Sequence, residues 1–367
     1  LTFMPFILPS ILVVLSMVLF FGNNGWINRG LMFLLNKDEP PIQFIYSISG
    51  ILIAHVFYNF PIAMKIVGDQ WERISSKYSQ VALSLGTGKI RLFFSIILPL
   101  LMPSIGSAFV LIFFLCMNSF AIILVLGGGI RYTTIEVLIY QLARIELDYS
   151  SASSLAFLQY GFSLFCVAIL YFFREQKVDQ MYTIKNSLYC KIRELCPKAL
   201  FGLFWILVVL IFALGPIFAI VFDSFRKFDN GEWIFTLFWY EKLFNINGNN
   251  SFLFSFWNSF KIGFASAVMS SILGFGLVSL IGFRKGIKRR FFEVFTLSPI
   301  ALSTVIFGIA WFHFYQENLA EIIPLIFVVI LMHSIMTTPF WIKIVLPSLE
   351  RIPQQWYLES KILGKKY

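Results

Sequence analysis

Long stretches without a charged residue dominate the pattern of the chain. Eight such stretches lie at residues 1–28, 40–64, 92–130, 149–173, 199–222, 262–283, 294–316 and 322–342. Each reaches the roughly 20 residues that an α-helix needs to cross a hydrocarbon core. A charged side chain at the centre of a bilayer costs about 2.5–3.5 kcal/mol, so charge-free stretches are typical of membrane spans. We therefore predict eight transmembrane helices, because lipid leaves an unclosed chain no other way to pair its backbone.

The third stretch, residues 92–130, is too long for one straight span. Pro99 and Pro103 lie near its start, and three consecutive glycines, Gly127–Gly129, lie near its end. Proline and glycine both interrupt regular helices. We expect a helix flanked by irregular backbone, in which the glycines form either a turn near a gate or a plain hairpin between two helices.

The loops between the stretches alternate in charge. One set contains 19 lysines and arginines and the other contains seven. The basic set is residues 69–91, 174–198, 284–290 and 351–367, and the second set is residues 22–39, 131–148, 223–242 and 315–321. Cytoplasmic loops of membrane proteins carry an excess of lysine and arginine. The pattern therefore predicts that the basic set faces the cytoplasm.

The composition narrows the class further. Hydrophobic residues make up 58% of the 367 residues and charged residues only 13%, with a net charge of +10. Soluble domains carry about 25% charged residues, so this composition excludes a soluble enzyme, a disordered protein and a nucleic-acid binder. The four cysteines have no disulfide or metal-ligand spacing, and the sequence lacks a phosphate-binding GxxxxGK[ST] loop. We therefore predict no catalytic site, no metal and no cofactor.

The chain contains an internal repeat. With an offset of 278 residues, residues 55–89 align without a gap to residues 333–367, and ten of the 35 positions are identical. Shared hydrophobicity does not explain the identity of charged, proline and glycine positions. These are Pro61 and Pro339, Lys65 and Lys343, Glu72 and Glu350, Arg73 and Arg351, and Gly86 and Gly364. Both copies run from an apolar stretch into a basic loop, so we predict two parallel, pseudo-symmetric halves with a central path between them.

We place the first transmembrane repeat at residues 1–173, a cytoplasmic linker at residues 174–198 and the second repeat at residues 199–367. The sequence starts in an apolar run without a charged leader, so we expect no signal peptide. The sequence enters an apolar run at once at Leu1 and stops in mid-pattern at Tyr367. We expect a fragment in which the first repeat lacks its first helices and the second is truncated in its cytoplasmic loop.

The loop and following stretch at residues 78–104 carry the motif that points to a function. The motif consists of Gln80, Ala82, Leu85, Gly86 and Pro99, with Leu363 and Gly364 as counterparts in the second copy. It resembles the cytoplasmic coupling loop of bacterial ABC importer permeases, whose pattern is Glu-Ala-Ala, three residues, Gly and a later Pro. Gln80 and Val81 replace the Glu and the first Ala, which puts the acidic contact with the ATPase in question.

The physical chemistry of this loop suits a docking element. Small residues and a glycine-ended turn let a short helix lie in a cleft of a partner, because glycine readily adopts the positive φ that ends such a helix. The alternative is an ordinary amphipathic loop helix with a glycine cap, followed by a span that starts at a proline.

Residues 54–67 and 119–143, and the fused two-half architecture, are similar to the thiamine ABC transporter permease family. This resemblance implies an all-α, polytopic protein of the bacterial inner membrane, surrounded by lipid and without nucleic-acid partners. It further implies two copies of a cytoplasmic ABC ATPase, a periplasmic solute-binding protein, and import of thiamine or its phosphates by alternating access. The protein itself would not be an enzyme.

Ferric-iron permeases share the fused architecture and are the alternative within transport. A channel and an integral-membrane enzyme are alternatives of another class. An enzyme should show clustered His, Asp or Glu at one membrane face, and none is visible in the sequence. A channel should not need a coupling loop for an ATPase.

Five polar residues are candidates for the translocation path. His55 and His333 occupy equivalent positions of the repeat, and an ionisable residue within the membrane is a functional candidate. The alternative is that each is a neutral histidine that forms a hydrogen bond to a neighbouring helix. Asn59 and Asn118 either line the path or join helices. Glu136 either meets a cationic substrate or is a solvated loop acid.

Overall fold

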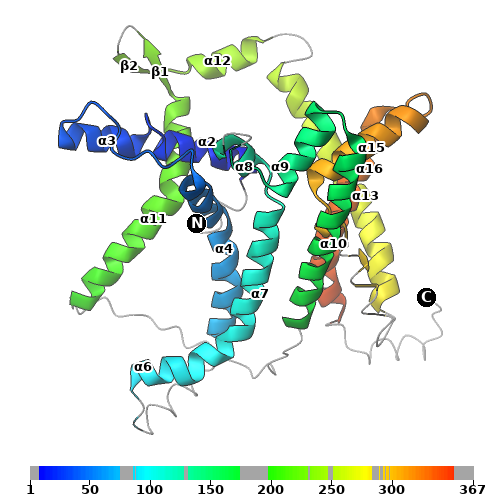
Figure 1. The fold of residues 1–367 in the computed structure, drawn as a ribbon, viewed down its shortest axis with the longest axis horizontal. Coiled ribbons are helices and arrows are strands. Elements are labelled where there is room, and N and C mark those ends of the chain that lie inside the picture. The colour runs from blue at the N-terminus through cyan, green and yellow to red at the C-terminus, as the bar shows by residue number, and fades with distance from the viewer. Residues whose placement is uncertain are drawn as a thin grey trace, which may run out of the picture. The chain divides into compact units, whose positions relative to one another are not determined.

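The structure is a computed structural model in which helices predominate (Figure 1). It describes residues 8–74, 86, 88–127, 131–173, 197–229, 232–246, 251–282, 289, 292–293, 295–296 and 298–350. The chain forms two compact units, one of residues 1–141 and 165–239 and the other of residues 142–164 and 240–367.

Seven stretches in the described part are long and apolar enough to cross a membrane. They are Ser10–Leu35, Ile48–Glu72, Ile90–Met117, Tyr149–Ile169, Gly202–Ser224, Phe252–Gly282 and Leu325–Leu346. The seventh predicted stretch, residues 294–316, is not among them. There the chain forms a short 3-10 helix, η3 (Ser298–Ala301), and then α15 (Thr304–Asn318). At about 1.5 Å per residue, the 15 residues of α15 are too short to cross a core about 30 Å thick.

In the first unit, an interrupted helical hairpin leads into a long helix. These elements are α2 (Ser10–Phe21), α3 (Trp26–Leu35) and α4 (Ile48–Arg73). The buried side chain of Asn28 holds the interruption together. Its Nδ2 donates to the carbonyls of Gly22 at 2.8 Å and Ile42 at 2.6 Å, and its Oδ1 accepts from the Ile42 amide at 2.9 Å.

The predicted irregularity of residues 92–130 is present. Four elements cover most of this stretch: α6 (Lys89–Leu92), a π-helical turn η1 (Phe93–Ile97), α7 (Leu98–Met117) and α8 (Ala121–Leu126). The chain changes direction between α6 and α7, and α7 runs beside α4 (Figure 1). Of the three glycines, only Gly127 lies within the described residues, where it ends α8.

The core of the first unit joins α2, α4, α8 and α9 (Ile135–Tyr140). Its fully buried side chains include Val13, Met17, Phe57, Leu126 and Val137. Helix α11 (Pro197–Ser224) also packs here, with the ring of Phe212 edge-on to that of Phe57 at 5.7 Å. This core fixes one end of α4, the helix that contains two of the predicted path residues, His55 and Asn59.

A short β-ribbon departs from the all-helical prediction. Strands β1 (Arg226–Asp229) and β2 (Glu232–Phe235) pair antiparallel within the predicted outer loop 223–242. Aromatic and β-branched residues favour strands, and an Asn-Gly pair between two such runs favours a tight hairpin. Asn230 and Gly231 stand at this point in the sequence. This signal would have predicted the ribbon.

Three further helical segments lie on either side of the long helix α11 in the sequence. They are a π-helical turn η2 (Gln141–Ile145), α10 (Tyr149–Phe173) and α12 (Phe238–Asn245). Asp148 begins α10 by accepting a hydrogen bond from the Ser151 amide at 3.0 Å. Hydrogen bonds from the side chain and backbone of Ser151 lower the pKa of the Asp148 carboxyl.

In the second unit, α13 (Phe252–Gly282) packs along α16 (Leu325–Glu350). The contact is a seam of buried residues spaced about one turn apart, with small and hydroxyl residues at one end and aliphatic residues at the other. It comprises Ser266, Ser270, Gly274 and Val278 on α13, and Ser334, Thr338, Ile342 and Leu346 on α16. The Ser266 hydroxyl donates to the Ile330 carbonyl at 3.3 Å, and the Ser270 and Thr338 hydroxyls lie 3.3 Å apart. The ring of Trp341 fills the space beside Gly274.

Candidate functional site

Two of the seven residues of the predicted coupling motif, Gly86 and Pro99, lie within the described part of the chain. Gly86 has a φ of +79° and is exposed. This left-handed conformation favours glycine, as expected for the turn. A Cβ at this position would meet nothing within 4 Å, so the backbone conformation rather than space requires the glycine. Gln80, Ala82, Leu85, Leu363 and Gly364 lie outside the described residues.

Pro99 lies in the first turn of α7, where its missing amide costs little. The π-helical turn η1 comes directly before it, between α7 and the loop. Phe93 of η1 contacts Trp71 near the end of α4, with ring centroids 6.1 Å apart. The loop therefore leaves α4 and enters α7 next to one aromatic contact.

Two of the predicted path residues lie together on α4, one turn apart. The His55 ring nitrogen Nδ1 is 2.8 Å from the Ile51 carbonyl, and Asn59 Nδ2 donates to the His55 carbonyl at 3.0 Å. Asn59 Nδ2 also lies 3.5 Å from Cys116 Sγ of α7. The two side chains are only 9% and 2% exposed. The pair thus lies where α4 faces the end of α7.

Two atoms of this pair are buried without a hydrogen-bond partner in the described part of the chain. They are His55 Nε2 and Asn59 Oδ1. A carbonyl only accepts, so the contact with Ile51 assigns the proton of a neutral imidazole to Nδ1. His55 Nε2 is then an acceptor, like Asn59 Oδ1. A buried polar atom without a partner costs about 1–3 kcal/mol, so this pair calls for an explanation other than stability.

The other candidates lie in different settings. Asn118 ends α7, where its Nδ2 donates to the Phe114 carbonyl at 2.9 Å. Glu136 is in the first turn of α9 and only 1% exposed, so the expectation of a solvated loop acid is wrong. The packing of Val137 and Leu126 in the same core carries Glu136 inward, and the N-terminal turn of a helix favours a carboxylate.

His333 differs from His55 in its surroundings. It lies on α16 in the second unit and is exposed, whereas His55 is buried. The buried polar residues of α16 are Ser334 and Thr338, which face α13. The sequence analysis missed this hydroxyl seam, although the four-residue spacing of Ser266, Ser270 and Gly274 would have indicated it. Among the described residues, no three His, Cys, Asp or Glu side chains gather to hold a metal.

The sequence of this chain is similar to those of transport proteins. Residues 1–180 match the family described as binding-protein-dependent transport system inner membrane component. A thiamine transport system permease protein of Brucella suis biovar 1 (strain 1330) is 26% identical over 94% of this chain and 60% of its own length. The permeases of the same description from Haemophilus influenzae and Escherichia coli K12 are 32% and 37% identical. These two matches cover 57% and 42% of this chain, and 37% and 28% of the relatives.

The chain therefore spans about 60% of the length of the Brucella permease that it matches. No solved structure matches it. The comparisons confirm the resemblance to importer permeases of the thiamine type that was predicted from residues 54–67, 78–104 and 119–143. Together with the seven apolar spans, they place the chain in the inner membrane.

Proposed function

We propose, from the premise that residues 1–180 belong to the binding-protein-dependent inner membrane components, that this chain is the permease subunit of an ATP-driven thiamine importer. It moves thiamine or its phosphates from the periplasm to the cytoplasm by alternating access. The observation that carries the proposal is the match to a thiamine permease over 94% of the chain, which extends well beyond residue 180. The alternative is a ferric-iron permease, and the transport experiment must distinguish it from a thiamine permease.

The partners follow from the same proposal. A cytoplasmic ATPase in two copies hydrolyses ATP, and a periplasmic binding protein delivers the solute. The loop that contains Gly86 docks in a cleft of one ATPase copy, and the loop that contains Gly364 docks in the other. The left-handed φ of Gly86 supports this assignment, because an exposed turn of this kind can end a short docking helix. The contact between Trp71 and Phe93 supports transmission to α4 and α7.

His55 and Asn59 are the path residues that we favour. Their two unpaired atoms are both acceptors, and thiamine carries an amino group on its pyrimidine ring that can donate two hydrogen bonds. The cationic thiazolium is also compatible with neutral acceptors, whereas a positively charged side chain would repel it. In this proposal a conformational change opens the α4–α7 contact and exposes both atoms to the solute. Asn118, Glu136 and His333 remain candidates without such an observation.

Helix boundaries support the proposed pseudo-symmetric halves. With the offset of 278 residues, Trp26 and Thr304 correspond, and they begin α3 and α15. Helices α4 and α16 both contain 26 residues, and their ends agree with the offset to within one residue. Each also has the equivalent proline, Pro61 or Pro339, inside the helix. The repeat boundaries at residues 173 and 199 remain predictions, since the compact units do not follow sequence order.

The same offset supports an eighth span. The interrupted stretch Ser10–Leu35 corresponds to residues 288–313, which include η3 and most of α15. Residues 289, 292–293 and 295–296 are helical where they are described. We propose that this region crosses the membrane as the counterpart of α2 and α3. Labelling of introduced cysteines tests the predicted orientation of the preceding loops: Lys191→Cys and Lys285→Cys should react from the cytoplasm, and Asn249→Cys only from the periplasm.

Transport assays test the function itself. The full-length permease is reconstituted in liposomes with the ATPase and binding protein encoded beside its gene, and uptake of radiolabelled thiamine and of ferric iron is measured. We expect thiamine uptake that requires ATP and the binding protein, and no iron uptake. Iron uptake without thiamine uptake would favour the alternative. Thiamine uptake that is independent of ATP would contradict an ABC importer.

A further inference from the structure

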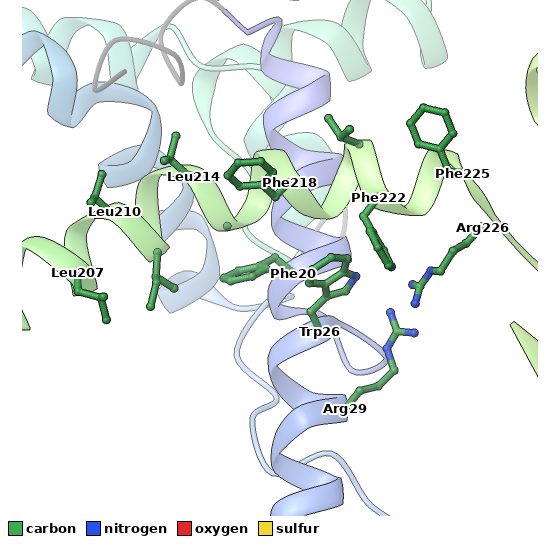
Figure 2. Close-up of a pocket in the computed structure, with 13 residues that line it drawn as sticks. Phe20, Trp26, Arg29, Leu207, Leu210, Leu214, Phe218, Phe222, Phe225 and Arg226 are labelled. Carbon is green, nitrogen blue, oxygen red and sulfur yellow. The ribbon is translucent and has the colours of Figure 1, made fainter. Parts of the chain in front are cut away.

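A pocket of about 960 Å³ lies in the first unit beside α11, and no part of the proposed transport mechanism uses it (Figure 2). Its long wall is an apolar stripe on α11 with Leu207, Leu210, Leu214 and Phe218. Phe20 of α2 and Trp26 of α3 form the opposite wall. Only two charged residues line it, Arg29 of α3 and Arg226 of β1, and both lie at one end.

Figure 2 shows the two guanidinium groups facing one another at the end of the pocket. Both guanidinium carbons also lie over the ring of Trp233, at 5.4 Å from its centroid for Arg29 and 4.4 Å for Arg226. Arg226 pairs with Asp223, whereas Arg29 has no ion-pair partner in the described part of the chain. Two guanidinium groups and one carboxylate leave one excess positive charge.

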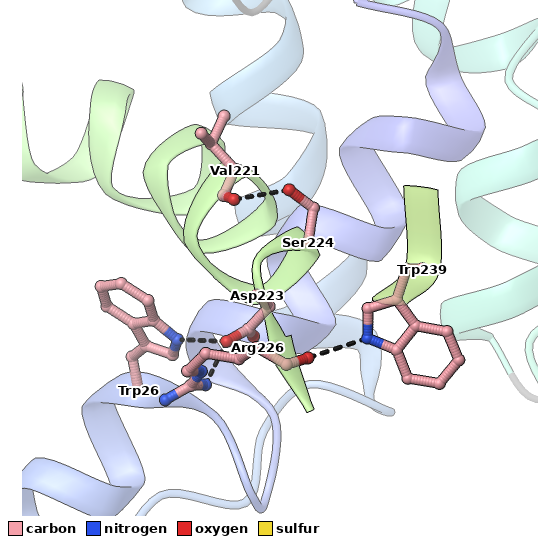
Figure 3. Close-up of polar contacts among 6 residues, drawn as sticks. All are labelled: Trp26, Val221, Asp223, Ser224, Arg226 and Trp239. Carbon is pink, nitrogen blue, oxygen red and sulfur yellow. Dashed lines mark hydrogen bonds and ion pairs between the residues drawn. The ribbon is translucent and has the colours of Figure 1, made fainter. Parts of the chain in front are cut away.

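Surrounding hydrogen bonds fix this arrangement (Figure 3). The Trp26 indole donates to Asp223 Oδ1 at 3.4 Å, and the Trp239 indole donates to the Arg226 carbonyl at 2.8 Å. The Nε atoms of Arg29 and Arg226 are nevertheless buried without a hydrogen-bond partner among the described residues. What the site lacks is a negatively charged hydrogen-bond acceptor between the two arginines.

The site lies where a membrane span ends. The apolar span of α11 ends at Ser224, two residues before Arg226. Three tryptophans, Trp26, Trp233 and Trp239, lie around the arginines. Tryptophan is enriched at the boundary between the hydrocarbon core and water. The apolar stripe from Leu207 to Phe222 is about 22 Å long at 1.5 Å per residue. This length exceeds the depth of the hydrocarbon part of one leaflet, which is roughly 15 Å.

We propose that this pocket binds one anionic phospholipid. Its phosphodiester lies between Arg29 and Arg226, and one acyl chain follows the stripe on α11. A phosphodiester carries the single negative charge that the cluster lacks, and its oxygens accept the hydrogen bonds that the two Nε atoms leave unused. Thiamine does not fit here, because a cation would be repelled by the arginines. The proposal rests on the membrane location alone and is independent of the transported solute.

The phosphodiester headgroup of phosphatidylglycerol adds no positive charge, whereas that of phosphatidylethanolamine brings an amine next to the arginines. We therefore expect a preference for phosphatidylglycerol. In the predicted topology, residues 22–39 and 223–242 face the periplasm, so the lipid belongs to the outer leaflet of the inner membrane.

Native mass spectrometry of the delipidated full-length permease tests the proposal, with dioleoyl phosphatidylglycerol as the probe. We expect one tightly held lipid on the wild-type protein and at least tenfold weaker binding in Arg29→Gln, which removes a charge without breaking an ion pair. Arg131→Gln is the matched control, because Arg131 lies in another predicted outer loop and stacks on Tyr132 away from the pocket. Equal lipid binding by both variants would overturn the proposal.

Three further measurements separate the alternatives. Arg29→Lys, which keeps the charge but not the planar donor fork, should bind the lipid with intermediate affinity. Displacement of the lipid by millimolar inorganic phosphate would identify a free-phosphate site and overturn the acyl-chain contact. Equal affinity for dioleoyl phosphatidylcholine would overturn the charge argument. Size-exclusion chromatography of each variant shows whether the fold is kept and whether a second copy covers the pocket instead.

Discussion

Helices α4 and α16 each contain 26 residues, and each has an internal proline and a histidine six residues before it. They nevertheless bury their polar residues in different ways. On α16, Ser334 and Thr338 face α13, and each hydroxyl has a partner within 3.3 Å. On α4, His55 and Asn59 are buried near α7, and each leaves one acceptor without a partner among the described residues.

This difference separates two roles of polar residues within a membrane protein. Paired hydroxyls between closely packed helices hold the helices together, each with a contribution of about 0.6 kcal/mol. An unpaired buried acceptor lowers stability, so its presence points to a second state in which it has a partner. From this contrast we propose a structural role for the polar residues of α16 and, in line with the proposed function, a role in the transport path for His55 and Asn59 of α4.

The largest expected effect concerns the two coupling loops. Gly86→Asp should abolish solute uptake and solute-stimulated ATP hydrolysis while the permease stays inserted, because it adds a charge and disfavours the positive φ. Gly364→Asp should reduce both less, since the first loop matches the importer motif better. Gly88→Asp is the control, because Gly88 lacks a positive φ and has open space around it. Equal losses at Gly86 and Gly364 would show that the halves couple symmetrically.

The second prediction tests the seam of α13 and α16. A Cβ on Gly274 would lie 2.5 Å from the Trp341 ring, so Gly274→Ala forces the two helices apart. Overpacking of this kind costs about 1–3 kcal/mol. Gly276→Ala is the control on the same helix, because nothing lies within 4 Å of its Cβ position. Thermal unfolding of the detergent-purified protein should separate the two variants. Identical melting temperatures would show that the seam is loosely packed.

The third prediction tests the role of the α4 pair. Asn59→Leu removes an unpaired buried acceptor, so the unfolding free energy should stay the same or rise by about 1 kcal/mol. Transport should still fall several-fold. Thr337→Val at the equivalent position of α16 should change neither, because Thr337 is exposed and bonds only within its own helix. Destabilisation of the Asn59→Leu variant together with normal uptake would instead make Asn59 a structural residue.

The smallest effect is expected for a single hydroxyl of the seam. Ser270→Ala removes one partner of Thr338, which still donates to the Ser334 carbonyl at 2.6 Å. We expect a loss of about 0.6 kcal/mol in unfolding free energy and no change in transport. Ser271→Ala is the matched control, since its exposed hydroxyl bonds only to the Ala267 carbonyl of α13. A loss of uptake in Ser270→Ala would remove the distinction between the two helices.

Much of this arrangement could be predicted from the sequence, because the free energy of placing a charge in lipid is large and local. Seven of the eight predicted charge-free stretches coincide in large part with apolar helical stretches long enough to span, and residues 92–130 are divided as expected. The positive φ of Gly86 also followed from its place in the motif. The remaining stretch, residues 294–316, differed because η3 interrupts it, which hydropathy alone does not detect.

Which polar atoms find a partner was decided by the tertiary structure. The sequence determined that His55, Asn59 and Glu136 lie in or beside apolar stretches, and it determined the small-residue spacing of α13. It did not determine that Glu136 is carried into the core, that His333 is exposed while His55 is buried, or that Arg29 and Arg226 meet across α3 and β1. Burial and pairing depend on residues far apart in the chain, because a hydrogen bond or an excess charge is a property of two neighbours and not of one position.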